Sequence, residues 1–496
     1  MNRQVLTLLA LLALLALLGC RRPSPPAPAP APEPDRAPPP AAVAPAPDDL
    51  QSLAGHQYYG VYLSGQKAGW AEEEMQVLPG GDVRMSTHVV LRIQRLGNEM
   101  QLELTDEVVY APLPAGSIRR FAMSEAVPGG GGTVRKGAVT GGALEVTIET
   151  GGNREVKSLP IPKETLSDML PRLVARRLAD AGGKPITTWQ FDRQALKDFA
   201  VETTLASRKA TRIQGVPATI LEVKGEDKVR GITMVSRITE AGRMLEMTLG
   251  PGLKLVLEDK ALAQNPAVAL PDLYRLSIVP VDRPLGDPAL VSVLQLRLDG
   301  LPPALSLSDG RQTQDGPTLT IRRRGLEALG AEALSPEDRA RWLEQTAFID
   351  YRAPSVAAFA KTAAADSSDV ERLRRLTHAV HQSLRYSLAT APVTASRILA
   401  DRAGDCTEHA RLLTAALRAL DVPAREVSGL AYSGDSDPGF AFHAWVEAYV
   451  DGRWLAADPT WDQVPIDATH VALSRDDPSA IVGLLGGVKA VVIATE

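Results

Sequence analysis

Cysteine is almost absent from this chain. Cys20 and Cys406 are the two cysteines among 496 residues, which excludes a cysteine-rich zinc site. Clusters of positive charge are missing as well, because 54 lysines and arginines stand against 59 acidic residues and runs such as Arg322-Arg323-Arg324 are short. Nucleic-acid binding needs clustered positive charge, so we expect no nucleic-acid partner.

Long apolar runs are scarce too, except at the start of the chain. Leu6–Leu18 is almost unbroken Leu and Ala, but it is shorter than the roughly 20 residues that a membrane-spanning helix needs. The run ends in Leu17-Leu18-Gly19-Cys20, which resembles a bacterial lipobox. We therefore expect residues 1–20 to be a lipoprotein signal peptide and Cys20 to be lipidated, with an ordinary secretory signal as the alternative.

A spacer follows the expected anchor. Residues 21–50 are mostly Pro and Ala, which favours an extended linker because such residues bury little apolar surface. An anchor and a linker would hold a folded body away from a membrane of the bacterial cell envelope. Arg21 stands where Asp favours inner-membrane retention in many lipoproteins, so it favours the outer membrane, facing the periplasm or the surface.

Residues 51–262 have the pattern of an antiparallel β domain. Their stretches rich in Val, Thr and Ile often alternate and are bounded by Gly, Asn and Asp. Examples are residues 58–63, 82–94, 99–110 and 232–238. They predict a β-sandwich or a curled sheet, with one helix over about 163–180. Residues 263–332 predict a small β module or an extension of this domain. Its short strands are expected around 274–279, 291–298 and 318–324.

Residues 333–496 change to helices followed by strands. Ser335-Pro336-Glu337-Asp338 is a typical helix start. Further helices are expected over about 368–386, 395–401 and 406–420. Strands are expected over 424–430, 443–450 and 454–458, and apolar residues 480–493 predict a buried terminal strand or helix. Asp451-Gly452 predicts a tight turn, which places His443 and Asp458 near one end of a hairpin.

Cys406, His443 and Asp458 together suit nucleophilic catalysis. If Cys20 is lipidated, Cys406 has no disulfide partner within the chain, so it is either an inert core thiol or a reactive one. At a helix start, the helix dipole favours thiolate, and free backbone N–H groups can hold an oxyanion. An imidazole can pair with the thiolate, and a carboxylate can orient the imidazole. A structural histidine and a turn aspartate are the alternatives for His443 and Asp458.

Four blocks in this order resemble the transglutaminase-like superfamily. They are Arg402-Ala403-Gly404-Asp405-Cys406-Thr407-Glu408-His409-Ala410, Leu417-Arg418-Ala419-Leu420-Asp421-Val422-Pro423-Ala424-Arg425, His443-Ala444-Trp445-Val446-Glu447 and Asp458-Pro459-Thr460-Trp461. The resemblance covers about 366–475 and implies a papain-like domain. The expected fold class is therefore α+β, with an N-terminal antiparallel β-rich part. Carried over by position, the resemblance makes Cys406 the nucleophile, His443 the base and Asp458 the orienting acid.

Four further residues are expected to support this site. Gly404 would let the chain turn tightly into the helix. His409, one turn after Cys406, is interpreted as a supporting or structural residue. Trp445 and Trp461 are expected to pack the hairpin, and one of them could floor a cleft. Cys406, His409 and His443 lack the spacing of a known metal site, so neither metal nor cofactor is expected. Loop 433–439 is interpreted as a solvated rim of the substrate groove rather than a cation site.

The resemblance implies acyl transfer from amide bonds of a peptide or protein substrate, through a thioester on the cysteine. Hydrolysis is favoured over crosslinking. The alternative is a non-enzymatic envelope scaffold that uses the same fold to bind partners. A third interpretation gives the function to the β-rich half, as a binder of lipid or glycan, but no residue pattern supports it.

Overall fold

The computed structural model describes the chain from residue 50 to residue 496. Within that range it does not describe residues 96–97, 127–131, 214–215, 230, 251, 267–268, 302–304, 365–366, 388–392, 437 and 476–486. The expected signal peptide, Cys20 and nearly all of the expected linker lie outside the described residues. None of the described helices is both long and apolar enough to cross a membrane.

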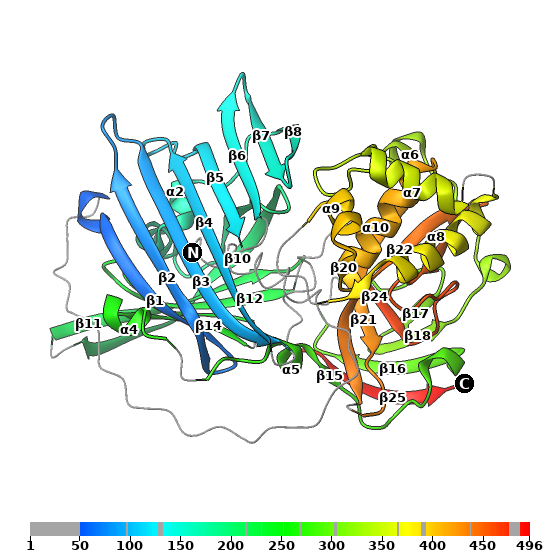
Figure 1. Ribbon diagram of the computed structural model, residues 1–496. Coiled ribbons are helices and arrows are strands. Elements are labelled where there is room, and N and C mark those ends of the chain that lie inside the picture. Colours follow the sequence, from blue (N-terminus) through cyan, green and yellow to red (C-terminus); the bar gives the residue numbers. More distant parts are fainter. Residues whose placement is uncertain are drawn as a thin grey trace.

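A single antiparallel sheet of 14 strands forms the first part of the chain (Figure 1). The strand order is β8-β7-β6-β5-β4-β3-β2-β1-β14-β13-β12-β11-β10-β9, so the strands are joined in one sheet rather than in two stacked sheets of a sandwich. The strands are β1 (Gly55–Leu63), β2 (Gln66–Val77), β3 (Val83–Arg95), β4 (Asn98–Tyr110), β5 (Ile118–Ala126), β6 (Gly132–Thr140), β7 (Ala143–Thr150), β8 (Asn153–Leu159), β9 (Ile186–Asp192), β10 (Lys197–Ile213), β11 (Val216–Asp227), β12 (Ile232–Thr239), β13 (Met244–Leu249) and β14 (Leu253–Glu258).

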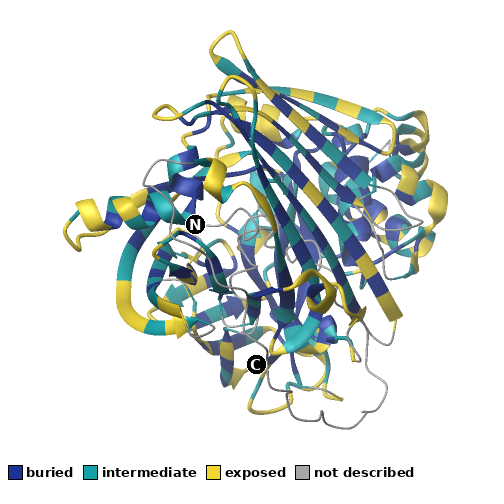
Figure 2. Cartoon of the chain, turned by 90° about the vertical axis from the view of Figure 1, so that its left-hand side faces the viewer, coloured by how far each residue is buried: buried dark blue, intermediate teal, exposed yellow. Residues whose placement is uncertain are grey.

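Alternating side chains explain why this sheet has one buried face. In β4, Met100, Leu102 and Leu104 are buried, whereas the residues between them are half-buried or exposed. Because successive side chains of a strand point to opposite faces, the apolar set packs into one core. Figure 2 shows this alternation as bands along the strands. Gly141-Gly142, both with positive φ, form the turn between β6 and β7.

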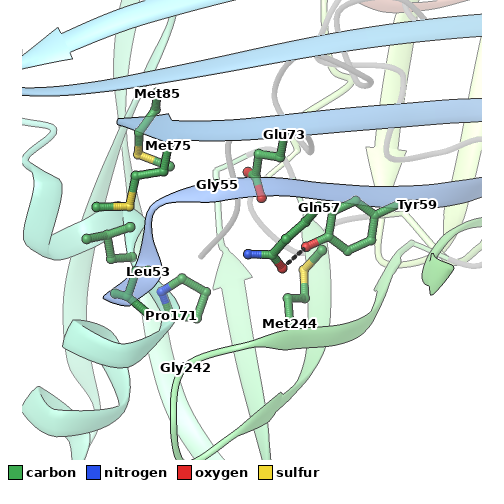
Figure 3. A pocket seen from close by; sticks show the side chains of 11 residues that line it. Leu53, Gly55, Gln57, Tyr59, Glu73, Met75, Met85, Pro171, Gly242 and Met244 are labelled. Atoms are coloured by element: carbon green, nitrogen blue, oxygen red, sulfur yellow. Dashed lines mark hydrogen bonds between the residues drawn. The ribbon is translucent and has the colours of Figure 1, made fainter. Parts of the chain in front are cut away.

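The helix expected over 163–180 is interrupted. It consists of α2 (Leu166–Met169) and α3 (Pro171–Asp180). Pro171 lacks an N–H group and disfavours helical backbone at the residue before it, so Leu170 is extended. A cavity of about 40 Å³ lies beside Pro171, where Tyr59 donates to Gln57 over 2.9 Å (Figure 3). This volume has room for little more than water.

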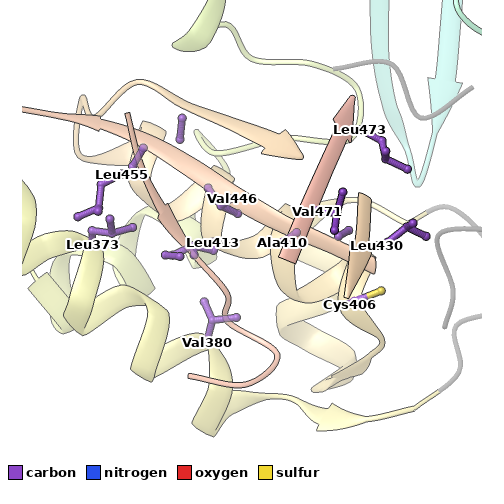
Figure 4. Close-up of a cluster of buried hydrophobic side chains, with 14 of the residues drawn as sticks. Leu373, Val380, Cys406, Ala410, Leu413, Leu430, Val446, Leu455, Val471 and Leu473 are labelled. Atoms are coloured by element: carbon purple, nitrogen blue, oxygen red, sulfur yellow. The ribbon is translucent and has the colours of Figure 1, made fainter. Parts of the chain in front are cut away.

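The C-terminal part packs helices against an antiparallel sheet of five strands. The helices are α6 (Pro336–Trp342), α7 (Pro354–Ala364), α8 (Asp369–Ser383), α9 (Ala395–Asp401) and α10 (Cys406–Ala419). The five-stranded sheet consists of β15 (Val279–Pro280), β22 (Gly439–Val450), β21 (Ala424–Tyr432), β24 (His470–Arg475) and β23 (Arg453–Ala457), the last of which pairs with β22. Helix α10 packs on β22 and β21, and its buried leucines enter the core drawn in Figure 4.

A third, four-stranded sheet joins distant parts of the sequence. Its strands are β17 (Gln312–Asp315), β18 (Thr318–Arg322), β16 (Val293–Asp299) and β25 (Lys489–Thr495). Leu294, Leu319 and Val492 belong to the same hydrophobic cluster as α10. The expected small β module therefore packs with the C-terminal part.

One expected strand is wrong. Residues 274–279 form mainly the short helix α5 (Leu273–Ser277), because Asp272 caps it by accepting a hydrogen bond from the N–H of Tyr274. Val279 and Pro280 form the short strand β15, which pairs with the edge of β22 at Phe440 and Gly439.

The remaining elements are short. They are the 3-10 turns η1 (Leu50–Leu53), η2 (Pro288–Leu290) and η3 (Leu326–Ala328), helix α4 (Lys260–Ala263), and strands β19 (Arg385–Tyr386) and β20 (Ala403–Gly404). The β-rich part and the C-terminal part also contact each other directly. The side chain of Asn153, at the start of β8, donates a hydrogen bond to Asp350 over 3.0 Å.

A buried charge cluster ties the strands of the C-terminal sheet together. Glu447 on β22 contacts Arg425 at 2.7 Å and Arg475 at 2.8 Å, and Arg475 also pairs with Asp309. Burial raises the pKa of Glu447, but the charges of Arg475 and Arg425 outweigh it and hold that pKa at about 2.

We predict that Glu447→Gln lowers the free energy of unfolding by about 3 kcal/mol at pH 7, because it leaves the partly buried guanidinium of Arg425 without this carboxylate and Arg475 with Asp309 alone. The contribution of the wild-type carboxylate is fully present above its unfolded pKa of 4.5 and is lost as the pH falls toward 2. Urea unfolding measures both effects. Glu371→Gln, which breaks the exposed helix pair with Arg375, is the matched control and should cost about 0.5 kcal/mol at most. Equal losses in the two variants would contradict the prediction.

Candidate active site

Cys406 is the first residue of helix α10 and is fully buried. Asp405 is the N-cap of this helix, and its carboxylate accepts hydrogen bonds from the N–H groups of Thr407 and Glu408. The side chain of Glu408 accepts in return from the N–H of Asp405 at 2.9 Å. This capping box fixes the helix start. It also occupies the N–H groups of Thr407 and Glu408, two of the helix-start donors that the sequence suggested for holding an oxyanion.

The expected role of Gly404 is corrected. Gly404 lies in the extended strand β20 and not among the residues with positive φ, so it makes no tight turn. Instead, a Cβ atom at this position would lie 2.3 Å from Cβ of Glu408. Glycine is required here because the buried Glu408 side chain packs directly on its backbone. Burial, together with the charge of Asp405, raises the pKa of Glu408 well above its ordinary value, which favours its neutral form.

His443 and Asp458 meet at the end of the β22–β23 hairpin. The Asp451-Gly452 turn has positive φ at both residues, as the expected tight turn requires. Val446 pairs with Ala457, so Asp458 directly follows β23. Nε2 of His443 lies 2.9 Å from Oδ2 of Asp458, and both side chains are fully buried.

The Asp458 carboxylate is held from several sides. Its Oδ1 accepts a hydrogen bond from the N–H of Thr460 at 2.7 Å. Its Oδ2 lies near two imidazole nitrogens, Nε2 of His443 and, at 3.3 Å, Nε2 of His470. Burial opposes the charged form, but the charge and hydrogen bonds of the two histidines hold the pKa of Asp458 well below its usual range. The carboxylate is therefore ionised and fixed in orientation.

The second ring nitrogen of His443 is directed to no acceptor or donor among the described residues. Nδ1 is buried and has no hydrogen-bond partner there. A buried polar nitrogen without a partner calls for an explanation, and a catalytic role is one such explanation. Helix α10, which begins with Cys406, packs on β22, which carries His443. The fold thus packs the helix that begins with Cys406 against the strand that carries the histidine.

Trp461 forms one wall of this arrangement. Its ring stacks on His443, with the centroids 4.5 Å apart and the planes inclined by 18°. Trp461 is half-buried, whereas Trp445 is fully buried in a separate cluster with Val427, Ala456, Ile466 and Ala472. Of the two expected tryptophans, Trp461 has the direct stacking contact and Trp445 mainly packs the sheet.

His409 faces the backbone of its own helix. Its Nδ1 lies 2.7 Å from the carbonyl oxygen of Asp405. Burial lowers the pKa of His409, which favours a neutral ring. These contacts describe a structural residue at the helix start. In loop 433–439, Asp435 accepts from Tyr432 at 2.6 Å and from the N–H of Gly286 at 3.1 Å, while Asp437 lies outside the described residues.

Sequence reasoning missed His470 and Asp467. His470 is the first residue of β24 and is fully buried. Its Nδ1 lies 3.0 Å from Oδ1 of Asp467 and its Nε2 faces Asp458. Burial alone would lower the pKa of His470, but the charge of Asp467 and the bonds to both aspartates raise it to about 9. The available signal was a histidine three residues after an aspartate at the start of an apolar strand.

One group of side chains has donor atoms close enough together for a metal ion among the described residues. His443, Asp458 and His470 offer atoms within 4.8 Å of one another. Two imidazoles and a carboxylate are a chemically suitable donor set for a transition metal. Here, however, both Nε2 atoms lie within hydrogen-bond reach of Asp458, so mutual hydrogen bonding accounts for the cluster. Neither Cys406 nor His409 belongs to it.

The β-rich part carries a broad groove of about 480 Å³ over β2 to β6. Glu72, Glu74, Glu107 and His88 are among its lining residues. These charged side chains stand beside apolar ones, among them Met123 and Val134.

Comparison with known proteins assigns the C-terminal part to a family. Residues 357–459 match the model of the transglutaminase-like superfamily. This part of the chain is a transglutaminase-like domain. It contains Cys406, His443 and Asp458 and confirms the α+β class expected for the chain.

The similar proteins cover only parts of the chain. An uncharacterized protein of Mycobacterium tuberculosis is 32% identical over 133 residues, which are 24% of this chain and 42% of that protein. The chain therefore spans less than half the length of this relative. A crystal structure of a candidate cysteine protease from Cytophaga hutchinsonii has 17% identity and a TM-score of 0.26, and covers 44% of this chain and 82% of that one. A β-barrel-like protein of unknown function from Brucella abortus has 13% identity and a TM-score of 0.33, and covers 41% and 94%.

We predict that Gly404→Ala lowers the melting temperature by several degrees, because the added methyl group collides with Glu408 and disturbs the start of α10. Gly325→Ala is the matched control, since a Cβ atom there meets nothing within 4 Å and its φ is −73°. Differential scanning calorimetry of both variants measures the effect. A Gly404→Ala protein as stable as the control would contradict the tight contact.

Proposed function

We propose that this protein is a cysteine-dependent hydrolase of amide bonds in peptides or proteins. The observation that carries the proposal is the buried His443–Asp458 pair, whose unpartnered Nδ1 lies on the strand against which the helix of Cys406 packs. The match of residues 357–459 to the transglutaminase-like superfamily supports the same roles: Cys406 as nucleophile, His443 as base and acid, and Asp458 as orienting carboxylate.

The reaction we propose has two steps. The thiolate of Cys406 attacks the carbonyl carbon, the C–N bond breaks, and the imidazolium of His443 gives its proton to the leaving amine. Water then attacks the thioester, His443 accepts its proton, and the acid product leaves with the thiolate restored. Asp458 keeps Nε2 of His443 protonated, so that Nδ1 serves the sulfur. In crosslinking, an amine would replace water in the second step.

Access to the thiol requires local movement in this proposal. Cys406, His443 and Asp458 are all fully buried. A peptide can therefore reach the sulfur only when segments around the site move apart. We further propose that the protein is held in the cell envelope by a lipid on Cys20, with residues 21–50 as the linker. The lipobox-like end of the apolar N-terminal run supports this location.

We predict fast alkylation of Cys406 by iodoacetamide near pH 6. A thiolate paired with imidazolium persists at that pH, whereas a peptide thiol with a pKa of about 8.5 is almost wholly protonated. Mass spectrometry of the Cys406 peptide measures the rate separately from Cys20. His443→Ala should slow this labelling markedly. Wild-type labelling no faster than that of a model peptide thiol would favour the alternative of a non-enzymatic scaffold.

We also predict that Cys406→Ala abolishes amide-bond cleavage while leaving the fold intact. His443→Ala should be nearly as severe, on the order of 10³-fold or more, and Asp458→Ala milder, because triad residues act as a unit. The measurement compares envelope proteins from cells with wild-type or variant protein, using mass spectrometry of new N-termini and of isopeptide crosslinks. Unchanged cleavage in Cys406→Ala would refute the mechanism. Crosslinks that depend on Cys406, without new termini, would assign transamidation instead of hydrolysis.

A further inference from the structure

We propose that His470 is a positioning residue of this site: as an imidazolium held between Asp467 and Asp458, it fixes the carboxylate that orients His443. The inference rests on the proposed function in that the site it serves is the one built around Cys406. It adds a second histidine and a second aspartate to the expected Cys–His–Asp set.

The hydrogen bonds form a continuous network from His443 to Asp467. Nε2 of His443 lies 2.9 Å from Oδ2 of Asp458, the same oxygen lies 3.3 Å from Nε2 of His470, and Nδ1 of His470 lies 3.0 Å from Oδ1 of Asp467. This network runs from β22 past the end of β23 to the start of β24. His470 is thus the element by which a third strand determines the position of Asp458.

Asp467 is itself rigidly held. Its Oδ1 accepts hydrogen bonds from the backbone N–H and the hydroxyl of Thr469, at 2.8 and 2.7 Å. Its Oδ2 accepts from the side-chain amide of Gln463 at 2.9 Å. The guanidinium of Arg311 donates to its backbone carbonyl at 2.7 Å. Nδ1 of His470 therefore faces the firmly held carboxylate of Asp467, and Nε2 faces Asp458.

Charge balance in a dry site explains why His470 is protonated. Asp458, Asp467, His443 and His470 are all buried, and two carboxylates without a fixed cation there would carry a large desolvation cost. An imidazolium at His470 lies between the two acids and offsets one of their two negative charges, whether or not His443 carries a second proton. The groups that face His470 are Asp458, Asp467 and the ring of His443, 5.8 Å away, while Arg311 contacts Asp467. Trp445 and Trp461 enclose the ring edge-on, each 5.3 Å from it.

This arrangement matters for the tautomer of His443. If His443 alone held Oδ2 of Asp458, the carboxylate could rotate about the hydrogen bond that its Oδ1 accepts from the N–H of Thr460. The second donor fixes the carboxylate plane, so that Nε2 of His443 keeps its proton and Nδ1 remains available to the thiol. His470 acts through Asp458 and does not itself touch the reacting atoms.

The test uses two variants of the full chain. His470→Gln keeps an amide donor but removes the positive charge, whereas Asp467→Asn keeps a hydrogen-bonding side chain but removes the charge that sustains the imidazolium. His88→Gln is the matched control, because His88 bonds Glu103 at 2.7 Å and stands edge-on to Trp70 in the β-rich sheet. Histidine ¹⁵N NMR gives the protonation and tautomer of each ring, and alkylation of the Cys406 peptide gives thiol reactivity against pH.

We expect wild-type His470 to stay protonated up to a pKa of about 9 and to lose its proton above it. Alkylation of Cys406 near pH 6 should slow about tenfold or more in His470→Gln. In Asp467→Asn, the pH at which His470 loses its proton should fall by at least one unit, about tenfold in proton affinity. His88→Gln should leave both measurements unchanged. The stabilising effect of His470 on folding should be complete below pH 6.5 and be lost as the pH rises through 9.

Two results would overturn the inference. One is a neutral His470 at pH 7 in the wild-type protein. The other is wild-type alkylation in His470→Gln together with an unchanged His470 titration in Asp467→Asn. If Cys406 of the wild-type protein proves inert, the proposed hydrolase fails instead, and the NMR tautomer of His443 in Asp467→Asn still decides whether His470 positions the Asp458–His443 pair. Asp467→Asn also supplies this answer if His470→Gln does not fold.

Discussion

The buried carboxylate of Asp458 is the group on which the arrangement of the C-terminal domain depends. It takes part in three contacts, with the N–H of Thr460, with His443 and with His470, and each comes from a different part of the chain. An ionised carboxylate without such partners would be very costly in a dry interior. The hairpin of β22 and β23 and the start of β24 must therefore meet at this one point for the charge to be tolerated.

Other buried acidic side chains hold the surrounding frame. Glu447 joins Arg425 and Arg475 across the same sheet. At the helix start, Asp405 and Glu408 cap α10 and keep Cys406 at its first position. Residues of one motif divide between two groups of contacts: His443 pairs with Asp458, and Glu447, four residues later on the same strand, anchors the sheet.

The β-rich part contributes a different kind of structure. Its 14 strands form one antiparallel sheet, and its described groove is lined by acidic side chains together with apolar ones. It connects to the transglutaminase-like domain through α5 and β15, which adds to the edge of β22. Tyr274 of α5 packs with Ala441 and with Trp461, whose ring stacks on His443. The junction between the two parts thus contacts one wall of the candidate active site.

The sequence by itself determined the local features of this protein. Alternation in the first half predicted antiparallel strands, Asp451-Gly452 predicted the tight turn, and the apolar stripe after Cys406 predicted its helix. These features follow from a residue and its near neighbours. They sufficed to place Cys406 at a helix start and His443 close to Asp458, because the hairpin makes that pair local.

Tertiary structure decided what depends on distant contacts. Two local features were missed as well: residues 274–279 fold mainly as a helix because Asp272 caps them, and Gly404 is needed because the Glu408 side chain packs on its backbone. His470 lies 27 positions after His443 in the numbering, and its one local signal, the aspartate three residues before it, does not indicate Asp458 as a partner. Only strand pairing places it beside Asp458, since a buried charge selects its partners by proximity in space and not along the chain.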